Sequence, residues 1–371
     1  MVNVVSCLPY LSWSQHPKEH PLPSHIQSSS VATPCGNLEL LCCQPQHRDP
    51  KTPPLIFVHG GFGFAAVWLD WMTYLYERGY AATMYAYSAR SHGASYAVPY
   101  LQMAWGTSLD DFASDLATVV KTITTHLEDE KEPILIAHSA GGALVQYALT
   151  NGMITATAFC LVGSVPHFGG LDAYWNWSKM DPWMHPRSWI LGLHPMSGLA
   201  HPKLVRQMFF SDRFPMDKVV DFMHWMAPYE SLGWAGGQNG SFWKWLMGKN
   251  EWLEPMRILK AVTGWDRRGD RVCVMVGSQD RMMDLNMARR QVSEFRAAVR
   301  AMALESSASQ GSRGADADAK ESTHEEDIPE VEAESLERVR LVVVQGAGHH
   351  TQNDVQRQAA AEAIWQWLEQ L

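Results

Sequence analysis

A serine between an apolar run and a helix-like stretch is the first residue of this chain that could do chemistry. The run Pro133-Ile-Leu-Ile-Ala-His-Ser-Ala-Gly-Gly142 is typical of a buried strand, and at Ser139 it enters a small-x-Ser-x-Gly pattern. Small neighbours allow a strained turn that lifts the serine hydroxyl above the strand, so the pattern predicts a nucleophile elbow. Ala137 stands where this motif more often has glycine, and we interpret it as a tolerated variant.

A glycine-rich loop could hold the negative charge that attack by such a serine creates. Pro54-Leu-Ile-Phe-Val-His-Gly-Gly-Phe-Gly63 is an apolar run that ends in this loop. Backbone N–H groups of a loop of this kind can face a developing oxyanion. We expect the oxyanion hole to consist of the backbone N–H groups of Gly61, Phe62 and Ala140.

Two further predicted strands end in the partners that a serine nucleophile needs. Arg271-Val-Cys-Val-Met-Val-Gly-Ser-Gln-Asp280 ends in an aspartate, and Arg340-Leu-Val-Val-Val-Gln-Gly-Ala-Gly-His-His350 ends in two histidines. An imidazole titrates near neutral pH, so His349 could accept the serine proton and return it to a leaving group. Asp280 would orient the ring and stabilise the imidazolium.

Together these motifs resemble the α/β-hydrolase superfamily, from about residue 31 to the C-terminus. A further segment agrees, because Tyr85-Ala-Tyr-Ser-Ala-Arg-Ser-His-Gly-Ala-Ser95 is similar to the family's Arg-x-His-Gly-x-Ser loop. The resemblance implies a mostly parallel, doubly wound sheet with an active site at the carboxyl ends of its strands. It also implies structural roles for Arg90, His92, His59 and His138.

Each catalytic assignment leaves an alternative open. The resemblance places the base directly after a glycine, which favours His349 over His350. Asp284 lies near Asp280 but is expected on the following helix, and Asp172 would follow the sixth strand, where some members of the family place the acid. We favour Asp280 because it directly ends its strand.

The chain has one predicted α/β core, interrupted by an insertion. An irregular lead covers residues 1–30, and the core covers residues 31–165 and 266–371. A hairpin is expected through Val31–Thr33 and Leu38–Cys43. Further strands are expected at residues 55–58, 81–87, 134–138 and 157–163, and a helix from Ser108 to about His126.

Residues 166–265 break the alternation of strands and helices. They contain ten of the sixteen tryptophans and nine of the nineteen methionines. The resemblance implies that an insertion at this point forms a helical lid over the serine. Tryptophan and methionine would give the inner face of a lid a flat, adaptable apolar surface, which favours an apolar or aromatic substrate.

The net charge of −9 comes from one segment of the chain. Residues 305–337 hold eleven acidic and two basic side chains, and the first part of this segment is poor in large apolar groups. We therefore expect a disordered acidic loop there. The remaining residues balance in charge, so the chain has no global basic field and we expect no nucleic-acid partner.

The six cysteines match neither a disulfide framework nor a zinc site. The N-terminus lacks a basic start and a sustained apolar region, and no stretch of about 18 apolar residues occurs. We therefore expect a cytoplasmic protein without a signal peptide or a membrane span. The oligomeric state is not indicated.

The motifs and the resemblance together predict a serine hydrolase. It would cleave an ester or thioester with an apolar or aromatic acyl part through an acyl-enzyme, without a metal or organic cofactor. An acyltransferase would use the same triad, with an alcohol or amine in place of water. A ligand-binding or non-hydrolytic protein on the same fold is the alternative outside hydrolysis.

Overall fold

The computed structural model describes residues 2–126, 131–237, 253–310 and 331–371. Within these ranges one sheet has the strand order β1-β2-β4-β3-β5-β6-β7-β9-β8. The strands from β4 to β9 run parallel, while β1, β2 and β8 extend the edges in antiparallel pairings. The strands are β1 (Ile26–Thr33), β2 (Gly36–Cys43), β3 (Leu55–Val58), β4 (Met84–Tyr87), β5 (Ile134–His138), β6 (Ala158–Val162), β7 (Val272–Gly277), β8 (Val331–Leu336) and β9 (Val339–Val344).

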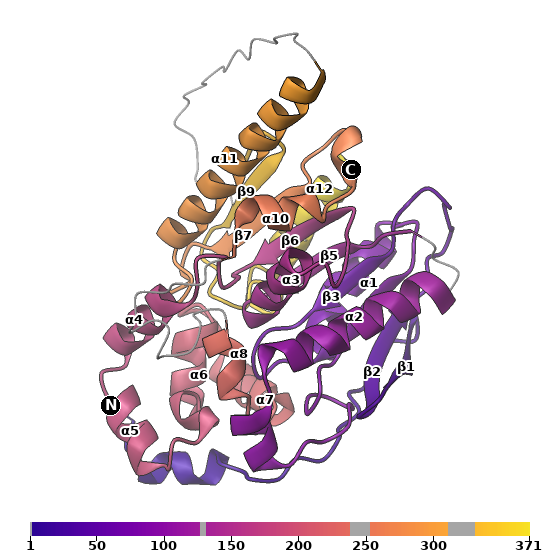
Figure 1. The fold of residues 1–371 in the computed structure, drawn as a ribbon. Helices are drawn as coiled ribbons and strands as arrows, with labels where there is room; N and C mark the ends of the chain where they lie inside the picture. Colours follow the sequence, from indigo (N-terminus) through magenta and orange to yellow (C-terminus); the bar gives the residue numbers. More distant parts are fainter. Residues whose placement is uncertain (1, 127–130, 238–252, 311–330) are drawn as a thin grey trace.

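Helices cover both faces of the sheet (Figure 1). One face carries α2, α3, α10 and α11, and the other carries α1 and α12. Among the described helices, none combines the length and the apolar character needed to cross a membrane. The α-helices are α1 (Leu69–Glu77), α2 (Leu109–His126), α3 (Ala140–Thr150), α4 (Leu171–Met180), α5 (Met184–Ile190), α6 (Pro202–Phe209), α7 (Met216–Trp225), α8 (Leu232–Gly237), α10 (Pro255–Lys260), α11 (Leu285–Gln310) and α12 (Arg357–Leu368). Shorter helical turns are η1 (Val5–Tyr10), η2 (Ala65–Trp68), η3 (Gln102–Gly106), η4 (Pro195–Gly198) and η5 (Gly264–Asp266).

The central strands β3, β5 and β6 are buried at every position because both faces of the sheet are covered. Strand β3 illustrates this arrangement. Leu55 and Phe57 pack in the core on the side of α1 and α12, whereas Ile56 and Val58 pack on the side of α2 and α3. Successive side chains of a strand point to opposite faces. The predicted mostly parallel and doubly wound sheet is confirmed.

The N-terminal lead is more regular than predicted. Strand β1 begins at Ile26 rather than near residue 31, and a 3-10 helix occupies Val5–Tyr10. The expected hairpin is present, with its antiparallel register running from Ile26 opposite Cys43 to Thr33 opposite Gly36. The start of β1, Gln27–Ser30, is exposed and rich in serine. It therefore lacks the apolar alternation by which a strand is predicted from sequence.

The predicted disordered loop at 305–337 is wrong at both ends. Helix α11 continues to Gln310, and residues 331–336 form strand β8, which pairs antiparallel with β9 at the edge of the sheet. Backbone pairing to β9 stabilises this exposed, glutamate-rich strand, so its composition did not reveal it. The remainder of the predicted loop, residues 311–330, lies outside the described residues. Strand β4 is also shorter than predicted and begins at Met84.

Helices α4 to α8 form a layer at the carboxyl ends of the parallel strands (Figure 1). We call residues 166–237 the helical layer. Its apolar side chains, among them Met208 and Phe209, form a cluster that also takes in Cys7 from the N-terminal lead and Met283 and Met287 from the core. Helix α10 falls inside the predicted insertion but packs with α3 and α11 in the main core, so the layer ends before residue 265.

Candidate active site

Ser139 lies at the junction between β5 and α3. Its backbone angles, φ 51° and ψ −122°, are outside the regions that non-glycine residues ordinarily occupy. A Cβ at Gly141 would collide with the carbonyl group of His59, and one at Gly142 would collide with the hydroxyl of Ser164. The two glycines permit the close approach that this strained turn requires.

The side chains of Ser139, His349 and Asp280 form one hydrogen-bonded chain. Ser139 Oγ is 2.9 Å from His349 Nε2, and His349 Nδ1 is 2.8 Å from Asp280 Oδ2. A carboxylate oxygen only accepts, so Nδ1 carries the ring proton and Nε2 faces the serine hydroxyl as an acceptor. All three residues are buried. The ends of three separate strands therefore meet in a geometry that suits proton transfer from the hydroxyl.

Strand β6 lies between the strand of the serine and the strand of the aspartate. Its end must therefore leave room for the hydrogen bond between Asp280 and His349. Gly163 directly follows β6 with φ 48°. A Cβ at this position would lie 3.2 Å from both Asp280 Oδ2 and His349 Nδ1. The glycine thus allows the carboxylate and the imidazole to meet across the end of β6.

Among the three carboxylates considered from the sequence, Asp280 is the one that contacts His349. Its second oxygen, Oδ1, accepts the backbone N–H groups of Met282 and Met283, each at 2.9 Å. These bonds fix the orientation of the side chain. Asp284 instead accepts the N–H of Met287 at the start of α11. Asp172 is exposed at the start of α4.

His138 and His350 pack against His349 without joining the chain. The ring of His138 lies 4.7 Å from that of His349 and 4.3 Å from that of His350. Burial and the neighbouring imidazoles hold the pKa values of His138 and His350 well below the usual range, so both are neutral near pH 7. Within the described ranges, no group of three or more histidine, cysteine or carboxylate side chains could hold a metal ion.

Of the three residues predicted to supply oxyanion donors, Gly61 and Phe62 lie in the loop after β3, and Ala140 begins α3. Gly61 and Ala140 line the same cavity as Ser139. Phe62 also lines the cavity and has φ 59°, but its N–H donates to Glu230 Oε2 at 2.9 Å and is not free for an oxyanion. Glu230 was missed by the sequence analysis because a lone acid in an insertion carries no motif.

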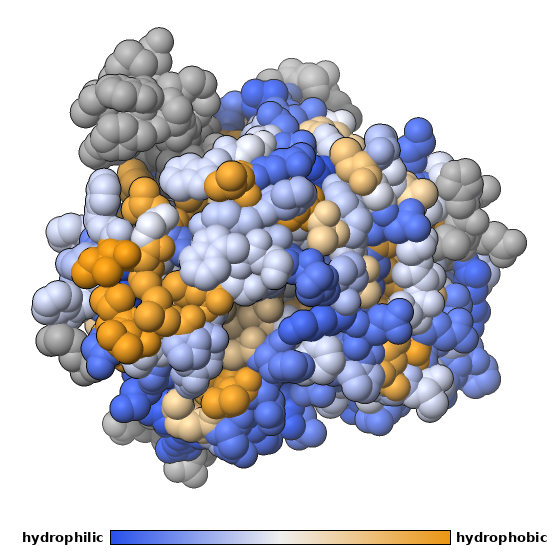
Figure 2. All heavy atoms as spheres, turned by 90° about the horizontal axis from the view of Figure 1, so that it is seen from below, coloured by the Kyte–Doolittle hydropathy of each residue, from blue (hydrophilic) through white to orange (hydrophobic). Residues whose placement is uncertain are grey.

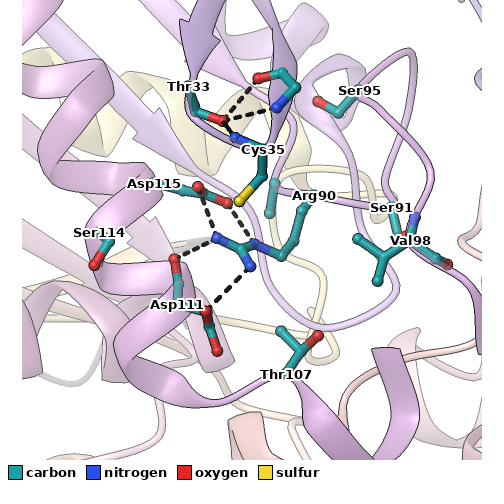
Figure 3. Close-up of polar contacts among 12 residues, drawn as sticks. Thr33, Cys35, Arg90, Ser91, Ser95, Val98, Thr107, Asp111, Ser114 and Asp115 are labelled. Atoms are coloured by element: carbon teal, nitrogen blue, oxygen red, sulfur yellow. Dashed lines mark hydrogen bonds and ion pairs between the residues drawn. The ribbon is translucent and has the colours of Figure 1, made fainter. Parts of the chain in front are cut away.

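The predicted Arg-x-His-Gly-x-Ser loop is fixed by a buried ion pair. Arg90 points toward α2, where its Nε and Nη2 atoms contact the two carboxylate oxygens of Asp115 at 2.7 and 2.9 Å (Figure 3). Asp111, one turn earlier, accepts a further bond from Arg90 through its backbone carbonyl. The expected structural role of Arg90 fits this geometry. Asp115 serves as its partner.

A cavity of about 350 Å³ opens beside Ser139 and reaches under the helical layer. Figure 2 views the end of the molecule that carries this layer, where apolar residues interrupt the polar surface. Most of the side chains that line the cavity are apolar or aromatic. They include Phe62, Trp105, Val165, Tyr174, Trp177, Met184, Leu193, Leu199, Phe209, Trp234, Met282 and Met283.

Comparison with known proteins supports a hydrolase on this fold. Residues 55–363 match the family model described as "Alpha/beta hydrolase family". Similar solved structures include 2-hydroxy-6-oxo-6-phenylhexa-2,4-dienoate hydrolase from Rhodococcus sp. strain RHA1, with 15% identity, a TM-score of 0.57, and 93% of this chain and 99% of that chain covered.

Two further solved structures have a similar fold. The carboxylesterase CesB from Bacillus subtilis has 14% identity and a TM-score of 0.52, with 98% of this chain and 95% of that chain covered. A bacterial membrane phospholipase A has 14% identity and a TM-score of 0.54, with 93% and 86% covered. At these identities the structures support the fold, whereas the family match extends over most of the sequence. The chain therefore belongs to the α/β-hydrolase family.

Proposed function

We propose that this protein is a serine hydrolase that cleaves carboxylic esters or thioesters with an apolar or aromatic acyl part. The observation that carries the proposal is the buried chain from Ser139 through His349 to Asp280 at the side of an apolar cavity. Each of the three groups has a task that its chemistry permits. A structural turn would not require all three at separate strand ends.

The first half of the reaction would acylate Ser139. His349 Nε2 takes the hydroxyl proton while Oγ bonds to the carbonyl carbon of the substrate. The carbonyl oxygen becomes an oxyanion that accepts the backbone N–H groups of Gly61 and Ala140. Collapse of this intermediate breaks the ester or thioester bond, and His349 gives the proton to the departing alkoxide or thiolate.

The second half would release the acid. His349 removes a proton from water as the water oxygen bonds to the acyl carbon, and the oxyanion forms again at the same donors. Its collapse breaks the bond to Ser139 Oγ, which regains its proton from His349. Asp280 stays ionised throughout and stabilises the imidazolium in both halves.

The lining of the cavity supports the proposed substrate class. A volume of about 350 Å³ is within the range of small-molecule sites. The aromatic and methionine side chains offer apolar contact area, and each buried methylene of an acyl chain contributes about 0.8 kcal/mol. We propose that the helical layer acts as a lid over this cavity.

Labelling with a fluorophosphonate probe tests the proposal directly. Intact mass and peptide mapping should show one adduct, on Ser139, and the Ser139→Ala and His349→Ala variants should lose it. Ser278→Ala is the matched control, since Ser278 also follows a strand end but lies outside the cavity lining. A Ser139→Ala protein that hydrolyses p-nitrophenyl esters at the parental rate would refute the assignment. The expected result is that kcat of Ser139→Ala falls by at least about 10³-fold.

A further inference from the structure

One segment of the helical layer, residues 226–234, is hydrogen-bonded to both sides of the proposed oxyanion site. Ala227 N–H donates to the carbonyl oxygen of Phe62 at 3.1 Å, and Phe62 N–H donates to Glu230 Oε2 at 2.9 Å. The indole N–H of Trp234 donates to the carbonyl oxygen of Ala140 at 3.0 Å. The segment therefore holds the loop after β3 and the first residue of α3 at the same time.

The segment is itself anchored to the core. The Tyr229 hydroxyl donates to the carbonyl oxygen of Val98 at 2.9 Å, and the Ser231 hydroxyl donates to that of Thr107 at 2.5 Å. Tyr229 and Ser231 are both buried. Glu230, between them, is thus fixed on both sides along the chain.

Glu230 is the one carboxylate among the described residues that line the cavity. It is 6% exposed, so its carboxylate is largely removed from water. Oε1 accepts the backbone N–H of Ser231 at 2.8 Å, and Oε2 accepts that of Phe62. Because both oxygens accept backbone donors, a glutamine at this position could satisfy one of these donors but not both.

The contacts of His92 place a proton between its ring and Glu230. His92 Nδ1 is 2.7 Å from the carbonyl oxygen of Arg90, which only accepts, so Nδ1 carries a hydrogen. Nε2 is 2.9 Å from Glu230 Oε2. Two acceptors at this distance require a proton between them. The pair therefore holds one shared proton and has no net charge.

Two basic neighbours of the pair, His59 and Arg90, add no unbalanced charge. His59, whose ring centroid lies 4.9 Å from that of His92, donates from Nδ1 to the carbonyl oxygen of Gly60 and accepts the N–H of Ala89 at Nε2. Burial lowers the pKa of His59 to about 3, so this ring is neutral. The guanidinium of Arg90 is balanced by its ion pair on α2.

We propose that Glu230 is a positioning residue of the oxyanion site, acting through the backbone of Phe62. Its carboxylate holds the loop after β3 in the conformation in which Gly61 faces the cavity. The proton shared with His92 lets it do so without placing a net negative charge where the oxyanion develops. This inference rests on the proposed function.

Kinetics of Glu230→Ala and Glu230→Gln in the full chain test the inference. The oxyanion exists only during the reaction, so kcat for p-nitrophenyl esters should fall while KM stays within about threefold. We expect a loss of about 100-fold for Glu230→Ala and about tenfold for Glu230→Gln, against the 10²–10³-fold loss typical of a deleted oxyanion donor. Amide hydrogen exchange should become faster in the peptide that contains Phe62.

The matched control is Glu294→Gln. Glu294 also pairs with a buried histidine, His167, at 2.6 Å, but it lies on α11 and outside the cavity lining. This variant should keep kcat within about twofold of the parent, and its exchange at Phe62 should be unchanged. If Glu230→Ala proves too unstable to assay, Glu230→Gln and the exchange measurement decide the question.

The outcomes separate this inference from the proposed function. A parent that carries the probe on Ser139, together with a Glu230→Ala variant of parental or higher kcat, would overturn the inference and leave the hydrolase intact. Loss confined to KM, or unchanged exchange at Phe62 in both variants, would also overturn it. A folded parent that is not labelled at Ser139 would overturn the proposed function and this inference with it.

Discussion

His138, the residue directly before Ser139, donates its Nε2–H to the backbone carbonyl oxygen of His349 at 3.1 Å. The strand of the proposed nucleophile therefore holds the backbone of the proposed base. His138 is buried and neutral, so it donates this bond without the cost of burying a charge.

Replacing His138 by leucine should leave the carbonyl oxygen of His349 without its donor. We expect a loss of about 1–3 kcal/mol in the free energy of unfolding, because this carbonyl group is buried. We also expect kcat to fall by about tenfold, since the backbone of His349 loses the hydrogen bond that helps to position its ring. Urea unfolding and ester kinetics measure the two effects. His138→Gln, whose amide can still donate, should recover part of both.

Asp280→Asn tests whether Asp280, rather than a neighbouring aspartate, orients His349. An asparagine can keep the contact with His349 but favours the wrong tautomer of the ring, so kcat should fall by about 10⁴-fold with little change in KM. Asp284→Asn, four residues along the chain, is the control and should stay within about threefold of the parent. Equal losses in the two variants would argue against the assignment of Asp280.

The ion pair between Arg90 and Asp115 predicts a non-additive pair of variants. Arg90→Met should lower the free energy of unfolding by about 3–5 kcal/mol, because it leaves the buried carboxylate of Asp115 without its partner. Adding Asp115→Leu removes that carboxylate and should restore much of the loss. Chemical unfolding of the four proteins in this cycle gives the coupling, and simple additivity would contradict the prediction.

Glu39 should make stability depend on pH. Burial raises the pKa of its carboxyl group above the ordinary value of 4.5, although Ser88 and the N–H of Ala94 bond to it. Folding therefore favours the protonated form. The stabilisation is complete below the ordinary pKa and is lost as the pH rises through the raised one.

Glu39→Gln should lack this loss because an amide does not titrate. Between about pH 4 and pH 7 the parent should become less stable relative to the variant. Urea unfolding at several pH values measures the difference. A constant difference across this range would show that the pKa of Glu39 is the same in the folded and unfolded states.

Trp177 should limit the length of the acyl chain. Its side chain lines the cavity beside Gly198, so Trp177→Ala should enlarge the space and move the maximum of kcat/KM to longer p-nitrophenyl esters. Each methylene that fits should raise kcat/KM by up to about fourfold. Trp175→Ala is the control, since that ring is 63% exposed and lies outside the cavity lining. An unchanged chain-length profile would place the acyl group elsewhere.

The strand-end motifs predicted most of the candidate site because local patterns identify such positions well. Each proposed partner directly follows a short apolar run, and the carboxyl ends of neighbouring parallel strands meet at one edge of a sheet. That rule alone brings Ser139, Asp280 and His349 together. The sequence predicted only the end of strand β1 and did not predict strand β8. Both are polar edge strands, which depend on backbone pairing rather than on an apolar pattern.

The sequence by itself determined the fold family, the order of the proposed triad and the glycines that its turn requires, since these depend on residues near one another in the chain. The tertiary structure decided what lies across the cavity. It brought Glu230 from the helical layer onto the N–H of Phe62, and placed His92 where the two must share a proton. In the sequence, Glu230 is separated from His92 by 138 positions and from Phe62 by 168. Such contacts follow from packing, and no local pattern in the chain specifies them.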